Sequence, residues 1–202
     1  MTDKPIKTIP FWVNQNLWSE IKDNKKLFNK YKLDNTKFLI GSFQRDTEGS
    51  DLISPKLSKG PDQFIEIVKH YKSIHENLHI VLTGKRRNYV IEKLKESNID
   101  FSYFEMVGFK ELNELYNCLN LYIVSSRVEG GPQSILECGL TKTPIISTDV
   151  GVASEILSSK SIYNMANFKE ATPDIVTAFR NSQHYSIPNG FQEFRKMLLD
   201  EN

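Results

Sequence analysis

Two stretches of the sequence place charged side chains beside glycine and proline, a pattern typical of a loop that opens a helix. The first runs from Gly41 to Arg45 and resumes at Lys59-Gly60-Pro61. The second runs from Ser125 to Ser134. The free N–H groups at a helix start and the positive end of the helix dipole bind anions. Arg45 and Lys59 would add full charges, so these groups together could hold a diphosphate.

Two glutamates in the second stretch add groups that could bind hydroxyls. Glu129 directly precedes Gly130-Gly131, and Glu137 follows Gln133 by four residues, which puts it one turn further along the same face of a predicted helix. A carboxylate accepts hydrogen bonds from two hydroxyls at once, which suits the vicinal diol of a ribose. The spacing equally allows a structural interpretation, in which Glu137 favours the helix dipole and Glu129 caps the loop.

Short apolar runs that alternate with stretches of helical periodicity predict an α/β fold, a Rossmann-like doubly wound parallel sheet with helices on both faces. The predicted strands are 38–41, 80–82, 101–106, 121–124 and 144–147, with a weaker sixth at 161–163. The predicted helices are 63–74, 88–96, 112–119, about 132–140, 168–180 and 191–199. With strand order 3-2-1-4-5, both glycine-bearing loops lie at the crevice between the first and fourth strands.

Residues 1–36 lack this alternation and are predicted to be an interdomain linker with a brief helix around Tyr31, while residues 37–202 form the Rossmann-like domain. Trp12 and Trp18 could stack on a ligand, but an aromatic pair that anchors a linker is the commoner arrangement. Loop 46–58 could be a lid, and we expect a solvated insertion. Lys85-Arg86-Arg87 could face the crevice, and we expect a solvated helix start.

The composition limits the partners and cofactors that the chain could use. A net charge of +1 over 202 residues gives no overall attraction to nucleic acid. No apolar run is long enough for a transmembrane helix, and residues 1–5 lack the apolar stretch of a signal peptide, so we expect a cytoplasmic protein. Cys118 and Cys138 are expected to be buried thiols. The four histidines show no metal-binding spacing, and we expect no protein-bound metal or other cofactor.

The segment from Glu129 to Glu137 resembles the E-x7-E motif of retaining glycosyltransferases of family 4, or group 1, whose fold is called GT-B. The flanking segments 108–125 and 144–156 are similar to that family as well, and the resemblance extends over about residues 9–157. Gly41 to Arg45 and Lys59-Gly60 match the family's donor-phosphate arginine and lysine positions.

This resemblance implies transfer of a sugar from a nucleotide-diphosphate donor, with retention of anomeric configuration and without an essential metal. Arg45 and Lys59 would bind the diphosphate, Glu129 would contact the sugar, and Glu137 the ribose. The implied catalytic residues are Glu129, Arg45 and Lys59, and the implied donor-binding residues are Gly130, Gly131, Pro132, Gln133, Ser134 and Glu137. Cations beside the leaving diphosphate would stabilise the negative charge that builds up in the transition state.

A GT-B enzyme has two Rossmann-like domains, and every feature named above belongs to the second, donor-binding domain. We therefore expect a sugar, lipid-linked or protein acceptor to be held by a missing N-terminal domain or a partner subunit. The chain would then be a fragment, a split subunit or a remnant that transfers little sugar alone. Two alternatives are a GT-B-like sugar-nucleotide epimerase and a non-catalytic interaction subunit that kept the fold.

Overall fold

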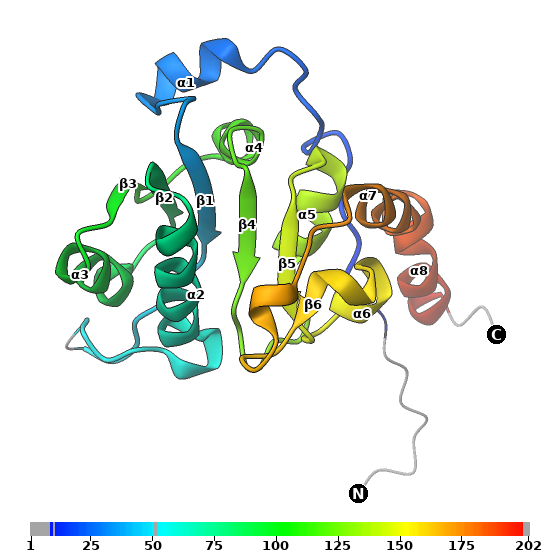
Figure 1. The fold of residues 1–202 in the computed structure, drawn as a ribbon. Helices are drawn as coiled ribbons and strands as arrows, with labels where there is room; N and C mark the ends of the chain where they lie inside the picture. Colours follow the sequence, from blue (N-terminus) through cyan, green and yellow to red (C-terminus); the bar gives the residue numbers. More distant parts are fainter. Residues whose placement is uncertain (1–8, 10, 51, 200–202) are drawn as a thin grey trace, which may run out of the picture.

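The computed structural model describes residues 9, 11–50 and 52–199. Its core is one parallel sheet of six strands in the order β3-β2-β1-β4-β5-β6 (Figure 1). The strands are β1 (Phe38–Phe43), β2 (Leu78–Thr83), β3 (Asp100–Phe104), β4 (Leu121–Val124), β5 (Ile145–Thr148) and β6 (Ile162–Tyr163). The predicted doubly wound sheet is confirmed, and β1 lies beside β4, with Ile40 paired to Leu121.

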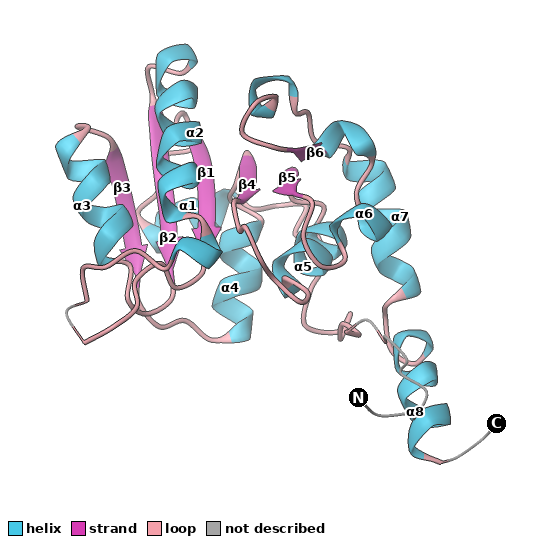
Figure 2. Cartoon of the chain, turned by 90° about the horizontal axis from the view of Figure 1, so that it is seen from below, coloured by secondary structure: helices cyan, strands magenta, loops and turns pink. Residues whose placement is uncertain are grey.

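Successive residues of the central strands point to opposite faces of the sheet, and each face is covered by helices (Figure 2). The helices are α1 (Lys25–Tyr31), α2 (Pro61–Ile74), α3 (Asn88–Glu96), α4 (Phe109–Tyr116), α5 (Gln133–Thr141), α6 (Ala153–Ile156), α7 (Ile175–His184) and α8 (Gln192–Leu198). Ile40 and Ile80 pack with α2 and α3, whereas Leu39 and Val81 pack with α4, α5, α6 and α7. Short 3₁₀ turns include η1 (Leu57–Lys59) and η3 (Phe168–Glu170).

The prediction of one helix over 168–180 is wrong, because the segment contains two elements. It begins as the 3₁₀ turn η3, and the α-helix α7 starts only at Ile175. Pro173 has no N–H to donate and keeps the residue before it out of the helical conformation. Asp174 then opens α7, since its carboxylate accepts a hydrogen bond from the Thr177 N–H at 3.1 Å.

The described part of the linker packs against the domain through aromatic contacts. The Trp18 ring is buried and meets the edges of Phe109 and Tyr116, with centroid distances of 6.1 and 5.8 Å. Trp12 packs on Phe191 and Phe194 near the other end of the chain. Residues 1–8 and 10 of the predicted linker lie outside the described residues, and the boundary at residue 36 stays a prediction.

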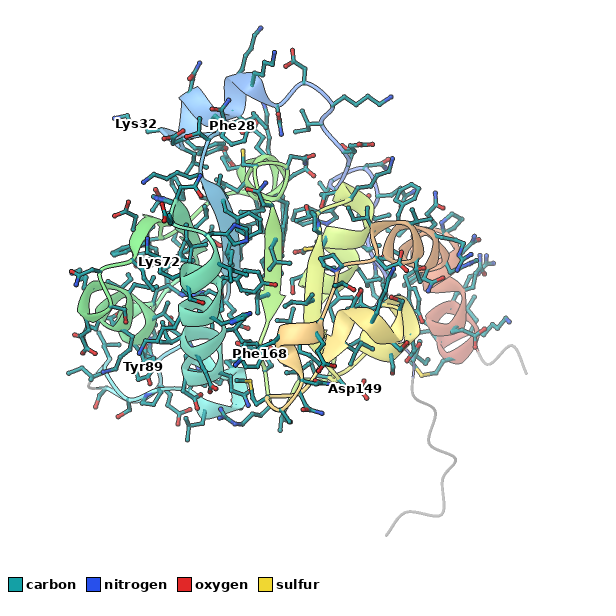
Figure 3. All side chains as sticks on the ribbon, viewed as in Figure 1. Phe28, Lys32, Lys72, Tyr89, Asp149 and Phe168 are labelled. Carbon is teal, nitrogen blue, oxygen red and sulfur yellow. The ribbon has the colours of Figure 1, made fainter. Side chains whose placement is uncertain are left out.

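The two ends of the sheet differ in what covers them. The linker helix α1 lies over the amino ends of the strands, where Figure 3 shows Phe28 and Lys32, while Asp149 lies at the opposite end. Cys118 and Cys138 are both buried and unpaired. None of the helices in the described ranges combines the length and hydrophobicity that a membrane crossing needs.

Candidate functional site

A cavity of about 240 Å³ lies at the carboxyl ends of β1 and β4, where the order of the strands reverses. Such a position is the usual ligand site of an open α/β sheet. The residues that line the cavity are Phe43, Gln44, Lys59, Leu112, Tyr116, Tyr122, Glu129, Pro132, Gln133, Ser134 and Glu137. The structure therefore brings Lys59, both acids of the E-x7-E segment and the start of α5 to one cavity.

The β1–α2 loop presents Lys59 on a closely constrained backbone. Gly60 follows it with φ +60°, a conformation that favours glycine, and Pro61 is the first residue of α2. A Cβ atom on Gly60 would lie 1.8 Å from the carbonyl oxygen of Ser125. The glycine thus allows the loop to approach the end of β4 closely.

Hydrogen bonds join the β1–α2 loop to the loop that follows β4. The Arg127 N–H donates to the Ser58 carbonyl at 2.8 Å, and the Arg127 guanidinium holds both carboxylate oxygens of Asp62, at 2.7 and 2.6 Å. Asp62 lies in the first turn of α2, so this helix start already has an acid beside it. Of the two helix starts expected at the crevice, only that of α5 lines the cavity.

Lys59 and Glu129 form an ion pair across the cavity. The Lys59 ammonium contacts Glu129 Oε1, which also accepts a hydrogen bond from the Ser126 hydroxyl at 3.0 Å. The two side chains are 26% and 10% exposed, so the pair is partly shielded from water. A polyanionic ligand in this cavity would compete with Glu129 for the ammonium group.

Helix α5 places Glu137 deeper in the cavity. The helix begins at Gln133, while Pro132 is extended with ψ 109°, so Pro132 caps the helix from outside. Glu137 lies one turn on and is 8% exposed, and its Oε2 accepts a hydrogen bond from the Tyr116 hydroxyl at 2.7 Å. Burial raises the pKa of Glu137 to about 7, against the lowering effect of that hydrogen bond.

Aromatic residues that sequence reasoning missed form part of the cavity wall. The Phe43 ring lies 4.9 Å from the Tyr116 ring and 5.3 Å from the Tyr122 ring, between centroids. The Phe43 N–H donates to the Tyr122 hydroxyl at 3.0 Å. Burial raises the pKa of Tyr116 well above its usual range, which keeps its proton available to Glu137. The available signal was positional, since Phe43 ends β1 and Tyr116 ends the helix before β4.

Three of the predicted site residues do not line the cavity. Arg45 follows β1 but its side chain is exposed. Gly130 is also exposed, and a Cβ on it would meet no atom within 4 Å. Gly131 packs against Gly151, on which a Cβ would lie 2.7 Å from the Gly131 Cα. These residues are near the cavity-lining residues in sequence, but they are not part of the lining.

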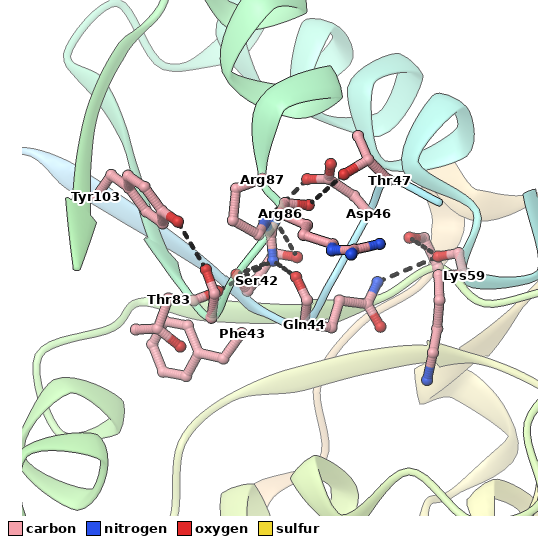
Figure 4. Close-up of polar contacts among 12 residues, drawn as sticks. Ser42, Phe43, Gln44, Asp46, Thr47, Lys59, Thr83, Arg86, Arg87 and Tyr103 are labelled. Carbon is pink, nitrogen blue, oxygen red and sulfur yellow. Dashed lines mark hydrogen bonds and ion pairs between the residues drawn. The ribbon is translucent and has the colours of Figure 1, made fainter. Parts of the chain in front are cut away.

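Parts of the loop after β1 and of the turn after β2 are more buried than the sequence indicated. Arg87 is fully buried, so the predicted solvated start of α3 is wrong at this residue (Figure 4). Asp46 and Thr47 of the predicted insertion are also buried, and Thr47 forms an antiparallel bridge with Pro55. Asp51, within the same loop, lies outside the described residues. The expectation of a wholly solvated insertion is therefore wrong at the base of the loop.

Among the residues that the structure describes, no three His, Cys, Asp or Glu side chains gather where they could hold a metal ion. The charged and amide groups at the cavity suit an anion instead. Lys59 supplies a full charge, and the start of α5 supplies N–H groups and a dipole. The absence of a metal requirement remains a prediction.

Several solved structures share the fold. A sucrose-phosphate synthase from Thermosynechococcus elongatus matches with a TM-score of 0.72 and 14% identity over 97% of this chain and 53% of its own. Anabaena HepE in complex with UDP-glucose matches with a TM-score of 0.70 and 18% identity over 94% of this chain and 56% of its own. The chain thus spans about half the length of these two proteins.

A third solved structure has nearly the same extent as this chain. The C-terminal domain of a group 1 family glycosyltransferase from Francisella tularensis, LpcC, matches with a TM-score of 0.62 and 16% identity. The match covers 91% of this chain and 97% of that domain. The predicted resemblance to the C-terminal half of a GT-B fold is confirmed. No curated protein matches the sequence.

The sequence itself matches one protein family. The profile of the family described as "Glycosyl transferases group 1" aligns with residues 52–179, which is more than half of the chain. The matched region contains Lys59 and the whole segment from Glu129 to Glu137. By this match the chain belongs to the group 1 glycosyltransferases.

Proposed function

We propose that this chain is the donor-binding domain of a retaining glycosyltransferase, and that its cavity takes a nucleotide-diphosphate sugar. One observation carries the proposal: Lys59, Glu129, Glu137 and the start of α5 line a single cavity where β1 and β4 separate. HepE, which shares the fold, binds UDP-glucose in its own structure. The chemistry of the cavity and this structural neighbour both support a nucleotide-diphosphate sugar as the donor.

The cavity offers a different group to each part of such a donor. Lys59 and the N–H groups at Gln133 and Ser134 suit the diphosphate. Arg45, which is exposed just after β1, would be a second cation for it. Glu137 suits the ribose diol, because Tyr116 holds one carboxylate oxygen and the other accepts no hydrogen bond from the described residues. Glu129 would contact the sugar once the diphosphate has taken over Lys59.

Charge development explains how this arrangement would promote transfer. When the bond between the sugar and the diphosphate breaks, negative charge grows on the leaving oxygen. A lysine and a helix start that are already in place stabilise that charge more than they stabilise the ground state. Loss of one such partner raises the barrier by about 3 kcal/mol, or roughly a hundredfold in rate. In this proposal these groups do the work that a metal ion does in other phosphoryl sites.

The chain spans about half the length of two of its structural neighbours, and we propose that the acceptor is held by another domain or subunit. Positioning of the two substrates supplies much of the rate, so the isolated chain would bind the donor and transfer little sugar. Robust transfer by the purified chain to any acceptor would overturn this part of the proposal.

Binding by the purified chain tests the donor site. Calorimetric titration with UDP, GDP and ADP is expected to detect at least one of them, and Lys59→Ala and Glu137→Ala are each expected to weaken that binding about tenfold or more. Lys93→Ala and Glu96→Ala are the matched controls, since these residues form an exposed ion pair on α3. Binding of none of the three nucleotides would favour the interaction subunit. Equal effects of the site and control variants would overturn the proposed cavity.

A further inference from the structure

We propose that Arg87 is a positioning residue for the donor diphosphate, which holds the backbone at the end of β1 and, through it, the Lys59 segment. The inference rests on the proposed function. It concerns a side chain that lies outside the cavity lining and belongs to the turn between β2 and α3. Figure 4 shows the contacts on which the argument depends.

The Arg87 guanidinium is buried beneath the end of β1 and donates to the chain there. Only 1% of its side chain is exposed. Its Nη1 donates to the Ser42 carbonyl at 2.8 Å and to the Gln44 carbonyl, and its Nη2 donates to the Ser42 hydroxyl at 3.1 Å. One planar guanidinium group therefore holds the carbonyls of Ser42 and Gln44, the residues on either side of Phe43. A lysine ammonium group cannot do this with the same geometry.

Asp46 extends the same network into the loop. Its carboxylate lies 2.9 Å from Arg87 Nε, and both side chains are 1% exposed. The Asp46 N–H donates to the Arg86 carbonyl at 3.1 Å, and the Asp46 carbonyl accepts from the Lys56 N–H at 2.8 Å. The ion pair and these two backbone hydrogen bonds together tie the start of the loop to the turn after β2 and to the segment that leads to Lys59.

Gln44 connects this network to the cavity. Its side-chain amide donates to the Lys59 carbonyl at 3.1 Å, and the Ser125 hydroxyl reaches the same oxygen at 3.3 Å. Arg45 lies between Gln44 and Asp46, which are both held by Arg87. The placement of both cations proposed for the diphosphate therefore depends on Arg87.

The energetics of buried ion pairs favour a role beyond stability. Desolvation of two charges commonly offsets their attraction, so an apolar pair of similar size would serve a stable core at least as well. The charged pair differs from an apolar pair because its guanidinium fixes the orientation of the backbone carbonyls that precede the proposed phosphate site. A small displacement of such a segment can reduce binding or rate by about a hundredfold.

The test compares ligands that do and do not carry phosphates. Titrations use UDP, GDP and ADP, and the nucleoside of whichever diphosphate the unmodified chain binds is measured by ligand-observed NMR. Arg87→Lys is expected to weaken diphosphate binding by about tenfold to a hundredfold and to leave nucleoside binding unchanged. Arg86→Lys is the matched control, since the Arg86 side chain is exposed and donates to the Gly49 carbonyl of the loop at 3.3 Å. It is expected to bind the diphosphate like the parent.

A purely structural role predicts a different pattern. Equal losses for the diphosphate and the nucleoside, or no loss in Arg87→Lys, would overturn the inference. If Arg87→Lys does not fold, Asp46→Asn decides: a selective loss of diphosphate affinity supports the role, and an equal loss or none refutes it. If the unmodified chain binds none of the three diphosphates, the proposed function fails together with this inference.

Discussion

The two loops that flank the cavity differ in how firmly the rest of the molecule holds them. The β1–α2 loop is fixed at its start by the buried Asp46–Arg87 pair and at its end by Gly60, which lies against Ser125. The β4–α5 loop is open around Gly130, and Val128 is 72% exposed. The cation of the site thus comes from a constrained backbone, whereas Glu129 comes from a backbone with space around it.

This difference indicates which side of the cavity would adapt to a ligand. A positively charged group that must meet a phosphate benefits from a fixed position, because no free energy is then spent on ordering it during binding. Glu129 would have to leave Lys59 when a diphosphate arrives, and the open loop gives it room to do so. We therefore expect structural adjustment in the β4–α5 loop and little in the β1–α2 loop.

The largest expected effect comes from adding a methyl group at Gly60 of the β1–α2 loop, and the same change at Gly130 of the β4–α5 loop is its comparison. Gly60→Ala would combine a strained φ of +60° with an overlap against the Ser125 carbonyl, and we expect a loss of about 4 kcal/mol in the free energy of unfolding. Gly130→Ala, its counterpart in the open loop, should change stability by less than about 0.5 kcal/mol. Urea unfolding measures both. Similar losses for the two variants would refute the contrast between the loops.

The next effect is a pH dependence of stability that Glu137 confers. Burial raises its pKa from 4.5 to about 7, so the folded state holds a proton in this range that the unfolded state releases. The contribution of Glu137 to the free energy of unfolding is greatest below pH 4.5. It falls as the pH rises through 7, by about 3 kcal/mol in total. Glu137→Gln should remove this decline when unfolding curves at several pH values are compared. Glu96→Gln, at an exposed position, should keep it.

Much of this arrangement could be predicted from the sequence, for physical reasons that also explain the errors. The buried strands are short apolar runs, and their alternation with helices indicates a doubly wound parallel sheet. The order 3-2-1-4-5 is that of the Rossmann-like form of such a sheet. That order brings Lys59 and Glu137 together although they are far apart in the chain. Local patterns, however, do not say where a side chain points. Arg45 carries the expected charge at the end of β1, yet its side chain lies outside the cavity lining.

Arg87 and Tyr116 show what sequence patterns miss. Lys85-Arg86-Arg87 looks like a solvated run, but Arg86 adopts a φ of +59°. Arg87 donates a hydrogen bond to Ser42 on β1, which lies 45 residues earlier in the sequence. Tyr116 fits an ordinary apolar helix face, and its partner Glu137 is 21 residues further on. Long-range polar contacts have no period along the chain, so neither could be inferred from spacing.

Removal of the Tyr116 hydrogen bond should have a smaller effect, which tests whether Glu137 is charged. Tyr116→Phe removes the donor to Glu137 Oε2. We expect the free energy of unfolding to fall by about 2 kcal/mol at about pH 8, where the carboxylate is charged. The loss should shrink toward about pH 5. Tyr163→Phe is the control, since its hydroxyl donates to the neutral Val124 carbonyl at 2.8 Å and its loss should not vary with pH. Matching pH profiles would contradict a charged acceptor.

The smallest effect expected comes from Glu129→Gln, which leaves Lys59 without its carboxylate partner. The pair is partly exposed, so its removal should change the affinity for a diphosphate by about 1 kcal/mol, or roughly fivefold. We expect UDP to bind more tightly to this variant, because UDP would no longer compete with Glu129 for the Lys59 ammonium group. Asp149→Asn controls for net charge, since Asp149 is an exposed acid that does not line the cavity.

The same variant distinguishes the two roles assigned to Glu129. For UDP-glucose the gain at the diphosphate would be offset by the loss of the proposed contact with the sugar. We therefore expect the ratio of UDP affinity to UDP-glucose affinity to rise in Glu129→Gln, as measured by calorimetry with both ligands. An unchanged ratio would mean that Glu129 acts on Lys59 alone, and the acid that meets the sugar would then have to come from outside the open loop.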